Sequence, residues 1–475
     1  MPASSKSARV AESVRAMIHD GRLRAGDALP STRALAAELG VARGTVVAAF
    51  EQLDGEGYLT TRHGAATRVA ATLAGAPVPV AATAAMSGSA VPEAAQPAPA
   101  AARPPEAAPA VPPLDLTPGV PAVRAISERD WRAAWRHAAA VPLRDSYPDR
   151  FGEPELRLEI AKQLGFSRGF APTEGRVIVT AGTAESLSLI AEALGPGARI
   201  AVENPGYRSG RQALAAAGAR LVPVGLDEHG LRLDELRAAH GRARLSAVSV
   251  TPSHQYPMGA VMPIGRRHEL LEWAAAEGVV VIEDDYDSEF RHHGSPLPAL
   301  AAIDTAGVVL HIGSLSKVLN PQLRCGYVVV PEGGAAAERV RAGRSARGAV
   351  VASPTQHAIA WLMNSGALRR HVARVRRDYA HKRAMVADAF AALPGVTAGA
   401  LAGGLHATVQ WGDGRSEDAV VAGIRRRGVV VVPLGFYVVE GSGLVTHGLV
   451  LGYGAVPASA LARALDGIVA ELALA

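Results

Sequence analysis

A segment of low sequence complexity divides this chain into two unequal parts. Residues 71–113 contain 17 alanines, 10 prolines and three charged residues, and they contain no aromatic side chain. Such a composition buries too little apolar surface to offset the entropy that is lost on ordering, and its prolines favour an extended chain. We therefore predict a linker at 71–113, a domain at 1–70 and a second domain at 114–475. At about 3.1 Å per residue the linker is long enough that the two domains need not touch.

The overall composition narrows the class of protein further. The chain has 475 residues, of which 49% are hydrophobic and 20% charged, as expected for a globular protein with more than one core. The single cysteine, Cys325, excludes an intramolecular disulfide framework and suits a reducing cytosol. Because no apolar run approaches about 18 residues and the N-terminus lacks a signal-peptide core, we expect a cytoplasmic protein without a membrane span. The net charge of +5 permits an anionic partner without identifying one.

The first 70 residues have the pattern of three helices followed by a β-hairpin. Apolar residues recur at helical spacing in three stretches, at 10–18, 35–39 and 46–53. Ser31 is a suitable N-cap for the second helix, and Gly40 ends that helix. Residues 58–61 and 67–69 then predict two short strands around a basic tip that contains glycine.

Two helices joined by a tight turn can place the second helix in a DNA major groove, where its first residues face the base edges. In this chain those residues are Arg43, Gly44 and Thr45. The alternative is a protein-interaction domain. Composition favours neither function, because residues 1–70 carry nine Lys or Arg against seven Asp or Glu.

Three stretches of this domain carry a family resemblance. Leu-Pro-Ser-Thr-Arg (29–33), Leu-Gly-Val-Ala-Arg (39–43) and Glu-Gln-Leu-x-x-Glu-Gly-Tyr-Leu (51–59) resemble the winged helix-turn-helix of GntR-type regulators. The resemblance spans residues 8–70 and implies a set of DNA contacts: Arg33, Arg43, Gly44 and Thr45, with His63 and Gly64 at a wing tip that enters the minor groove. Ala42 replaces the usual serine, and Ala65-Ala66 replaces a more glycine- and serine-rich wing, so we expect fewer phosphate contacts.

From about residue 170 onward, short apolar runs alternate with helical stretches. The runs lie at 177–179, 200–202, 247–250, 279–282 and 308–310. Continuous apolar strands between helices predict a mostly parallel sheet that is covered on both faces. In such sheets ligands bind beyond the carboxyl ends of the strands.

Polar motifs follow these predicted strands. Four acids occur in Glu-Asp-Asp-Tyr-Asp-Ser-Glu-Phe (283–290), where their mutual repulsion calls for a nearby cation such as a protonated pyridinium nitrogen. Lys317 follows the next strand, and it is one of only four lysines among 49 basic residues. A lysine amine can condense with an aldehyde to form a Schiff base, whereas a guanidinium cannot.

The remaining motifs are suited to a phosphate group. Thr-Ala-Gly-Thr-Ala (180–184) follows a strand and opens a helix, so its backbone N–H groups can bind a phosphate. Ser314 and Arg324 add a hydroxyl donor and a fork-shaped guanidinium. A phosphate cradle, an amine, an acid and a phenol together meet the requirements of pyridoxal 5′-phosphate (PLP).

The large domain resembles a fold-type I aminotransferase over residues 114–470. The expected fold class is therefore α/β, with a mostly parallel sheet, helices on both faces and a smaller C-terminal α+β part. The resemblance implies that Lys317 forms the Schiff base with PLP, that Asp284 pairs with the ring nitrogen and that Tyr286 bonds the ring hydroxyl. The resemblance also implies that the phosphate is bound by Ser314, Arg324 and the N–H groups of Thr183 and Ala184. Tyr207 is expected to stack on the ring. Tyr147 is expected to bind the phosphate of the partner subunit, which implies a homodimer. We predict no metal site.

The whole chain resembles the MocR family of bacterial transcription regulators. The resemblance rests on the domain at 1–70, which we call the head, on the linker, on the acidic motif and on Thr-Pro-Ser-His-Gln-Tyr-Pro-Met-Gly (251–259). Two positions depart from ordinary aminotransferases. Tyr256 stands where these enzymes carry an asparagine that bonds the ring hydroxyl, and Val450, near His447, replaces the arginine that binds the α-carboxylate. Both departures suit a sensor at least as well as a catalyst.

We therefore expect a PLP-dependent transcription regulator that binds repeated half-sites of double-stranded DNA as a homodimer. Its effector is a small amine, an amino acid or PLP itself, and we do not expect efficient turnover. Two alternatives stay open: a working aminotransferase with an incidental head, and a regulator with an empty cofactor site. The run at 366–383 has seven Arg or Lys against one Asp, and we interpret it as a solvated outer helix rather than a second DNA surface.

Overall fold

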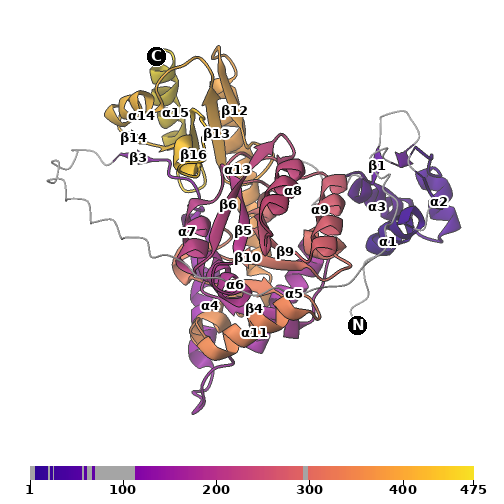
Figure 1. The fold of residues 1–475 in the computed structure, drawn as a ribbon. Coiled ribbons are helices and arrows are strands. Elements are labelled where there is room, and N and C mark those ends of the chain that lie inside the picture. The colour runs from indigo at the N-terminus through magenta and orange to yellow at the C-terminus, as the bar shows by residue number, and fades with distance from the viewer. Residues whose placement is uncertain are drawn as a thin grey trace.

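The computed structural model forms a small head and a large domain (Figure 1). It describes residues 6–19, 22–24, 26–55, 58–60, 67–69, 113–291 and 298–474. Nearly all of the predicted linker lies outside the described residues, as do His63 and Gly64 of the predicted wing tip. Within the described ranges, no helix is long and apolar enough to cross a membrane.

The head has the predicted order of three helices and a hairpin. Its elements are α1 (Lys6–His19), α2 (Thr32–Glu38), α3 (Arg43–Gly55), β1 (Leu59–Thr60) and β2 (Arg68–Val69). Ser31 caps α2, because its hydroxyl accepts a hydrogen bond from the backbone N–H of Ala34 at 3.2 Å. Val14, Val46 and Phe50 are buried together between the helices.

An eight-stranded sheet forms the centre of the large domain. Its strand order is β4-β11-β10-β9-β8-β5-β6-β7. The strands are β4 (Val177–Thr180), β5 (Arg199–Asn204), β6 (Arg220–Asp227), β7 (Gly230–Leu231), β8 (Ala247–Val250), β9 (Val280–Asp285), β10 (Val309–Ser314) and β11 (Gly326–Val329). The pairs from β10 through β6 are parallel, whereas β11 runs antiparallel to both of its neighbours and β7 is antiparallel to β6.

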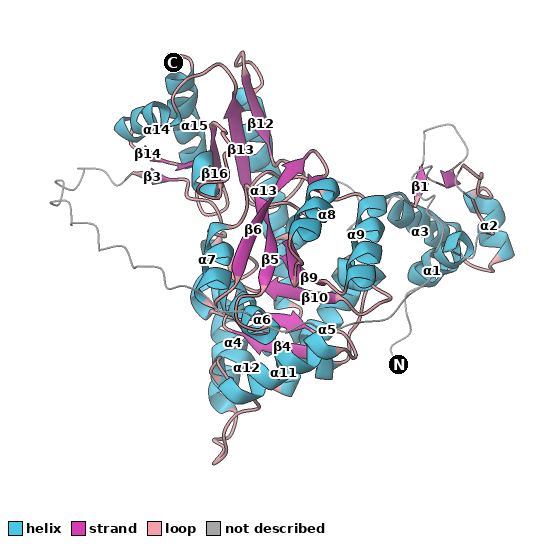
Figure 2. Cartoon of the chain, viewed as in Figure 1, coloured by secondary structure: helices cyan, strands magenta, loops and turns pink. Residues whose placement is uncertain are grey.

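Helices cover both faces of this sheet (Figure 2). The helices of the large domain are α4 (Glu128–Ala140), α5 (Pro154–Ser167), α6 (Thr183–Leu194), α7 (Arg208–Ala216), α8 (Leu233–Arg242), α9 (Ile264–Glu277), α10 (Leu300–Ile303), α11 (Ala335–Arg347), α12 (Ser353–Asn364), α13 (Ala367–Phe390), α14 (Glu417–Arg426) and α15 (Ala458–Leu472). Alternate residues of β4 belong to different apolar clusters: Val177 and Val179 pack with α5 and α12, and Ile178 packs with α6. This alternation confirms the predicted fold class.

The smaller C-terminal part has its own four-stranded antiparallel sheet. The order of its strands is β12 (Val396–Gly399), β13 (His406–Trp411), β16 (Gly448–Gly452) and β15 (Val432–Pro433). The chain enters the large domain through β3 (Leu114–Asp115), which pairs in parallel with β14 (Val429–Val430) of this part. The beginning and the end of the large domain are thus held together.

Helix α13 contains the basic run and is longer than predicted. Arg369, Arg374 and Arg377 are exposed on it, whereas Val375 and Tyr379 are buried. The helix therefore has one solvated basic face and one face that packs on the core, as expected for an outer helix.

The head contacts the large domain at α9. The phenol oxygen of Tyr58 lies 3.2 Å from Nε2 of His268, and Ile264 is buried in the apolar core of the head at 3% exposure. Ile264 and His268 are one helical turn apart, so they lie on the same face of α9. The linker is long enough to leave the domains apart, but in this structure they are in contact.

Candidate functional site

The predicted polar motifs meet at one edge of the eight-stranded sheet. In the parallel pair of β9 and β10, Asp284 lies opposite Ile312 and Asp285 opposite Gly313, so the chain that leaves β10 toward Lys317 begins beside the acidic motif. Strands β4 and β10 are both antiparallel to β11, so they run in the same direction. The carboxyl end of β4 therefore lies at the same edge of the sheet, where Thr180 leads into α6. The carboxyl ends of the strands therefore bring together segments that are far apart in the sequence.

Lys317 is half-buried at this edge. Its Nζ donates a hydrogen bond of 2.6 Å to the carbonyl oxygen of Gly119. Gly119 has a φ of +87°, and a Cβ at this position would lie 2.7 Å from Nζ, so the approach requires glycine. Burial lowers the pKa of Lys317, while the charges of Asp287 and Asp284 oppose this shift. A lowered pKa increases the neutral fraction of the amine, which is the nucleophilic form.

Asp284 is a buried carboxylate with an unsatisfied oxygen. Among the described protein groups, its Oδ1 has no hydrogen-bond partner. Burial, followed by the charges of Asp285 and Glu203, raises the pKa of Asp284 to about 7, and Lys317 and His311 counteract that shift. An unpaired buried carboxylate fits a cationic partner such as a protonated ring nitrogen.

A guanidinium lies beside the turn that opens α6. A Cβ on Gly182 would be in ordinary contact with Nη2 of Arg324, at 3.5 Å, so the guanidinium lies beside this turn, and the φ of +96° itself favours glycine. Thr183 and Ala184 are the first two residues of α6, where backbone N–H groups lack intrahelical acceptors. This combination of donors fits a phosphate. Ser314 ends β10, and its Oγ accepts a hydrogen bond from the N–H of Ser316 at 3.2 Å.

Aromatic side chains form a wall at the site. Tyr256 contacts Tyr207 and Tyr286 edge-on, with ring centroids 6.2 Å and 5.6 Å apart, and its hydroxyl donates to that of Tyr437 at 3.0 Å. Val450 is fully buried in the apolar cluster of Tyr437, against which Tyr256 packs. The position that we predict to correspond to the carboxylate-binding arginine of aminotransferases is therefore apolar.

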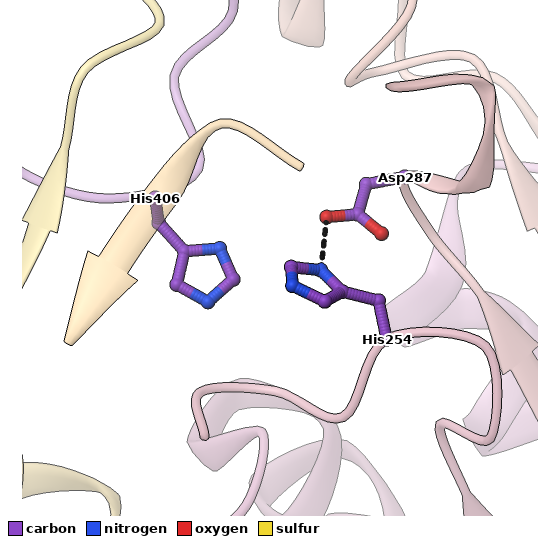
Figure 3. A group of neighbouring side chains, drawn as sticks. All are labelled: His254, Asp287 and His406. Carbon is purple, nitrogen blue, oxygen red and sulfur yellow. Dashed lines mark hydrogen bonds and ion pairs between the residues drawn. The ribbon is translucent and has the colours of Figure 1, made fainter. Parts of the chain in front are cut away.

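Sequence reasoning missed a second polar group, which lies beside Tyr286. Nδ1 of His254 lies 3.0 Å from the Tyr286 hydroxyl and 2.9 Å from Oδ2 of Asp287. His406, from β13 of the C-terminal part, faces the His254 ring with centroids 5.2 Å apart (Figure 3). His254 and Asp287 occur within the quoted motifs, but only the fold brings His406 to them.

Two family models match the chain. "Aminotransferase class I and II" matches residues 115–449, and "Bacterial regulatory proteins, gntR family" matches residues 6–69. The HTH-type pyridoxine biosynthesis transcriptional regulator PdxR of Corynebacterium glutamicum is 39% identical over 94% of this chain and 91% of its own length. The probable rhizopine catabolism regulatory protein MocR of Rhizobium meliloti is 33% identical over 78% of this chain and 74% of its own. This chain belongs to the MocR family.

Solved structures agree with the fold of this MocR-family chain. A kynurenine aminotransferase from Pyrococcus horikoshii has a TM-score of 0.68 at 23% identity and covers 77% of this chain and 92% of its own. The α-aminoadipate aminotransferase LysN from Thermus thermophilus has a TM-score of 0.68 at 25% identity, with coverages of 76% and 94%. The aminotransferase-like architecture thus accounts for the large domain.

In this MocR-family chain, Tyr147 is almost fully exposed. Its side chain is 99% exposed in the segment between α4 and α5, whereas Asp284 is buried at 6%. The predicted head residues are accessible as well: Arg33, Arg43 and Gly44 are exposed and Thr45 is half-buried. Nε of Arg43 donates to the hydroxyl of Thr32 at 3.4 Å, so it links the first residues of α3 and α2.

Glu203 is a further buried acid that sequence reasoning missed. It lines a cavity together with Asp284, Tyr207 and Arg211. Its Oε2 accepts hydrogen bonds from the Thr251 hydroxyl at 2.5 Å and from Nε2 of Gln255 at 3.1 Å. Burial raises the pKa of Glu203 to about 7, although these hydrogen bonds oppose the shift.

Glu203 should make the stability of the cofactor-free protein depend on pH. Between the ordinary pKa of 4.5 and the folded value of about 7, the folded protein holds a proton that the unfolded chain releases. The resulting stabilisation is present below pH 4.5 and is lost as the pH rises through about 7. We expect Glu203→Gln to remove a contribution on the order of 3 kcal/mol across this range, as measured by urea unfolding at a series of pH values. The exposed control Glu228→Gln should follow the wild type, and parallel curves for wild type and Glu203→Gln would contradict the assignment.

Proposed function

We propose that this protein is a PLP-dependent transcription regulator whose head binds double-stranded DNA and whose large domain senses a small amine, an amino acid or PLP itself. The observation that carries the proposal is the joint presence of a half-buried Lys317, an unpaired Asp284 and the Arg324–Gly182 phosphate cradle. These groups occur in the same chain as a head of the gntR type. In this proposal, residues 1–70 form the DNA-binding head, residues 71–113 the linker and residues 114–475 the PLP-binding domain.

The described residues suit separate parts of PLP. When bound, PLP supplies an aldehyde that condenses with primary amines and a ring that withdraws electrons. Lys317 would be the covalent attachment point and Asp284 the partner of the ring nitrogen. Tyr286 would bond the ring hydroxyl, and Tyr207 would stack on the ring. The phosphate would be held by Ser314, Arg324, Thr183 and Ala184.

The contact between the domains offers a route from the site to the head. Residues 251–262 carry Tyr256 at the site and lead directly into α9, whose Ile264 and His268 contact the head. An effector that binds one conformation of this segment better than another shifts the population toward that conformation. The position of the head relative to the large domain would then change with the effector.

The proposal includes a cytoplasmic homodimer that binds two DNA half-sites. Two-fold symmetric dimers match repeated half-sites on DNA. The nearly complete exposure of Tyr147 suits a residue that completes the partner subunit's phosphate site. The test is a gel-shift titration of the full-length protein against its upstream DNA, repeated with PLP and with a panel of amines. Specific binding that shifts with an amine supports the proposal.

A working aminotransferase is the second candidate, and the lowered pKa of Lys317 favours it. A steady-state assay with a panel of amino donors and 2-oxo acids separates the two functions. Turnover on the order of tens per second without specific DNA binding would defeat the regulator proposal. Buried Val450 provides no charge for a carboxylate, so either another arginine binds the carboxylate of an α-amino acid or the ligand is not a simple α-amino acid.

Arg43→Ala should weaken specific DNA binding by about 1–3 kcal/mol, or roughly 5- to 150-fold in affinity. Arg43 is exposed at the first position of α3, where a recognition helix meets the base edges. The measurement is the dissociation constant for the operator at fixed salt concentration. Arg463→Ala, which removes an equal charge from an exposed position of α15, serves as the control and should leave the affinity unchanged. Equal affinities for wild type and Arg43→Ala would refute the assignment.

A further inference from the structure

Three buried side chains meet beside the proposed cofactor site. His254 follows β8, Asp287 follows β9 and His406 lies on β13, and they are 3%, 1% and 1% exposed (Figure 3). One ring nitrogen from each histidine and one carboxylate oxygen all lie within 4.8 Å of one another. Within the described part of the chain, this is the one group of three His, Cys, Asp or Glu side chains with such spacing.

The hydrogen bonds fix where the lone pairs of the two imidazoles lie. Nε2 of His406 lies 3.1 Å from the carbonyl oxygen of Pro257, which can only accept, so this nitrogen carries the proton and Nδ1 has the lone pair. Nδ1 of His254 lies 2.9 Å from the Asp287 carboxylate and therefore donates to it. The lone pair of His254 is then on Nε2, which is buried and has no hydrogen-bond partner among the described groups.

One further feature suits a bound cation, and one opposes it. A Cβ on Gly404 would lie 2.3 Å from Oδ2 of Asp287 and 2.8 Å from Cε1 of His254, so only a glycine leaves these groups their present positions. The positive charge of Lys317 acts on both His406 and Asp287. A carboxylate is therefore needed to offset that charge when a second cation binds nearby.

We propose that His254, Asp287 and His406 form a binding site for a divalent transition-metal ion of the Zn²⁺ class. Imidazole nitrogens and a carboxylate oxygen are preferred ligands for such ions. Because Asp287 lies on the Nδ1 side of His254, an ion that both residues bind takes the place of the Nδ1 proton, which moves to the vacant lone pair of Nε2. Three protein ligands leave a coordination position open for water or for a donor atom of the effector. The site goes beyond the proposed regulator function and does not require that PLP be bound.

The test uses untagged full-length protein that has been stripped with a chelator and then dialysed against zinc, with and without PLP. We expect about one zinc ion per chain by elemental analysis. His406→Phe and His254→Phe should each weaken binding by about 100-fold or more, and Asp287→Asn by about 10- to 100-fold. His381→Ala, which removes an exposed histidine from α13, is the matched control and should keep full occupancy. Cobalt in place of zinc should give visible absorption bands that are lost in His406→Phe.

Wild-type protein that retains no zinc after dialysis overturns the metal site, and this measurement does not depend on whether any variant folds. Zinc binding that is equal in wild type and in folded His406→Phe also overturns it. The visible absorbance of bound PLP, recorded on the same samples, tests the cofactor proposal separately. Normal PLP absorbance without zinc defeats only the metal site, and zinc without PLP absorbance defeats only the cofactor site.

Discussion

Lys317→Ala is expected to abolish covalent retention of PLP. Wild-type protein that is incubated with PLP, reduced with borohydride and denatured should carry one cofactor per chain by intact mass, and the variant should carry none. The reason is that Lys317 combines burial, a lowered pKa and proximity to Asp284. Lys162, in contrast, is half-exposed and paired with Glu159, and Lys382 is paired with Asp378.

Two further variants sharpen this test. Lys162→Ala removes a lysine outside the site and should retain the cofactor in full. Lys317→Arg keeps a positive charge but cannot condense with an aldehyde, so it should behave like Lys317→Ala. Cofactor mass that persists on the Lys317 variants would show that another lysine is the attachment point.

Asp285→Ala is expected to lower the free energy of unfolding by about 3–5 kcal/mol, because it leaves the buried charge of Arg168 without its main partner. The guanidinium of Arg168 bonds directly to Asp285, and the two side chains are 3% and 4% exposed. Burial alone would lower the pKa of Arg168, but the charges of Asp285 and Glu289 raise it above its ordinary value. Urea unfolding at neutral pH measures the change.

The matched control removes an acid from an exposed pair. Glu269 pairs with Arg237 at the surface, where the two side chains are 49% and 45% exposed, and such pairs contribute about 0–1 kcal/mol, so Glu269→Ala should have little effect. The double variant Arg168→Met/Asp285→Leu should recover much of the lost stability, because no unpaired charge remains. A loss below about 1 kcal/mol in Asp285→Ala would mean that water or Glu289 compensates for Arg168.

Local patterns were sufficient to predict five strands of the central sheet, β4, β5, β8, β9 and β10, and to bring much of the candidate site together. Residues 279–282 and 308–310 are continuous apolar runs, and each is followed directly by its polar motif, so Asp284 and Lys317 could be placed at one sheet edge. The order of the head elements followed in the same way from helical spacing and from the cap at Ser31.

Long-range contacts could not be predicted in this way. Tyr437 and His406 reach the site from the C-terminal part, and nothing in their local sequence marks them as neighbours of Tyr256 or His254. Nothing in the local sequence singles out Glu203, and its raised pKa follows only from burial in the assembled fold. The contact of Tyr58 with His268 likewise depends on how two separately folding units meet.

The hydrogen bond from Lys317 to Gly119 connects the reactive amine to the segment that follows the linker to the head. Gly119 lies shortly after the linker, on the segment that continues from β3. An amine that has condensed with an aldehyde has fewer protons to donate. The hydrogen bond to Gly119 would therefore weaken when Lys317 reacts. The segment that follows the linker would then lose its contact with the site, while the pairing of β3 with β14 still holds its beginning. The chemical state of one nitrogen would thus be registered in the first stretch of chain after the DNA-binding domain and the linker.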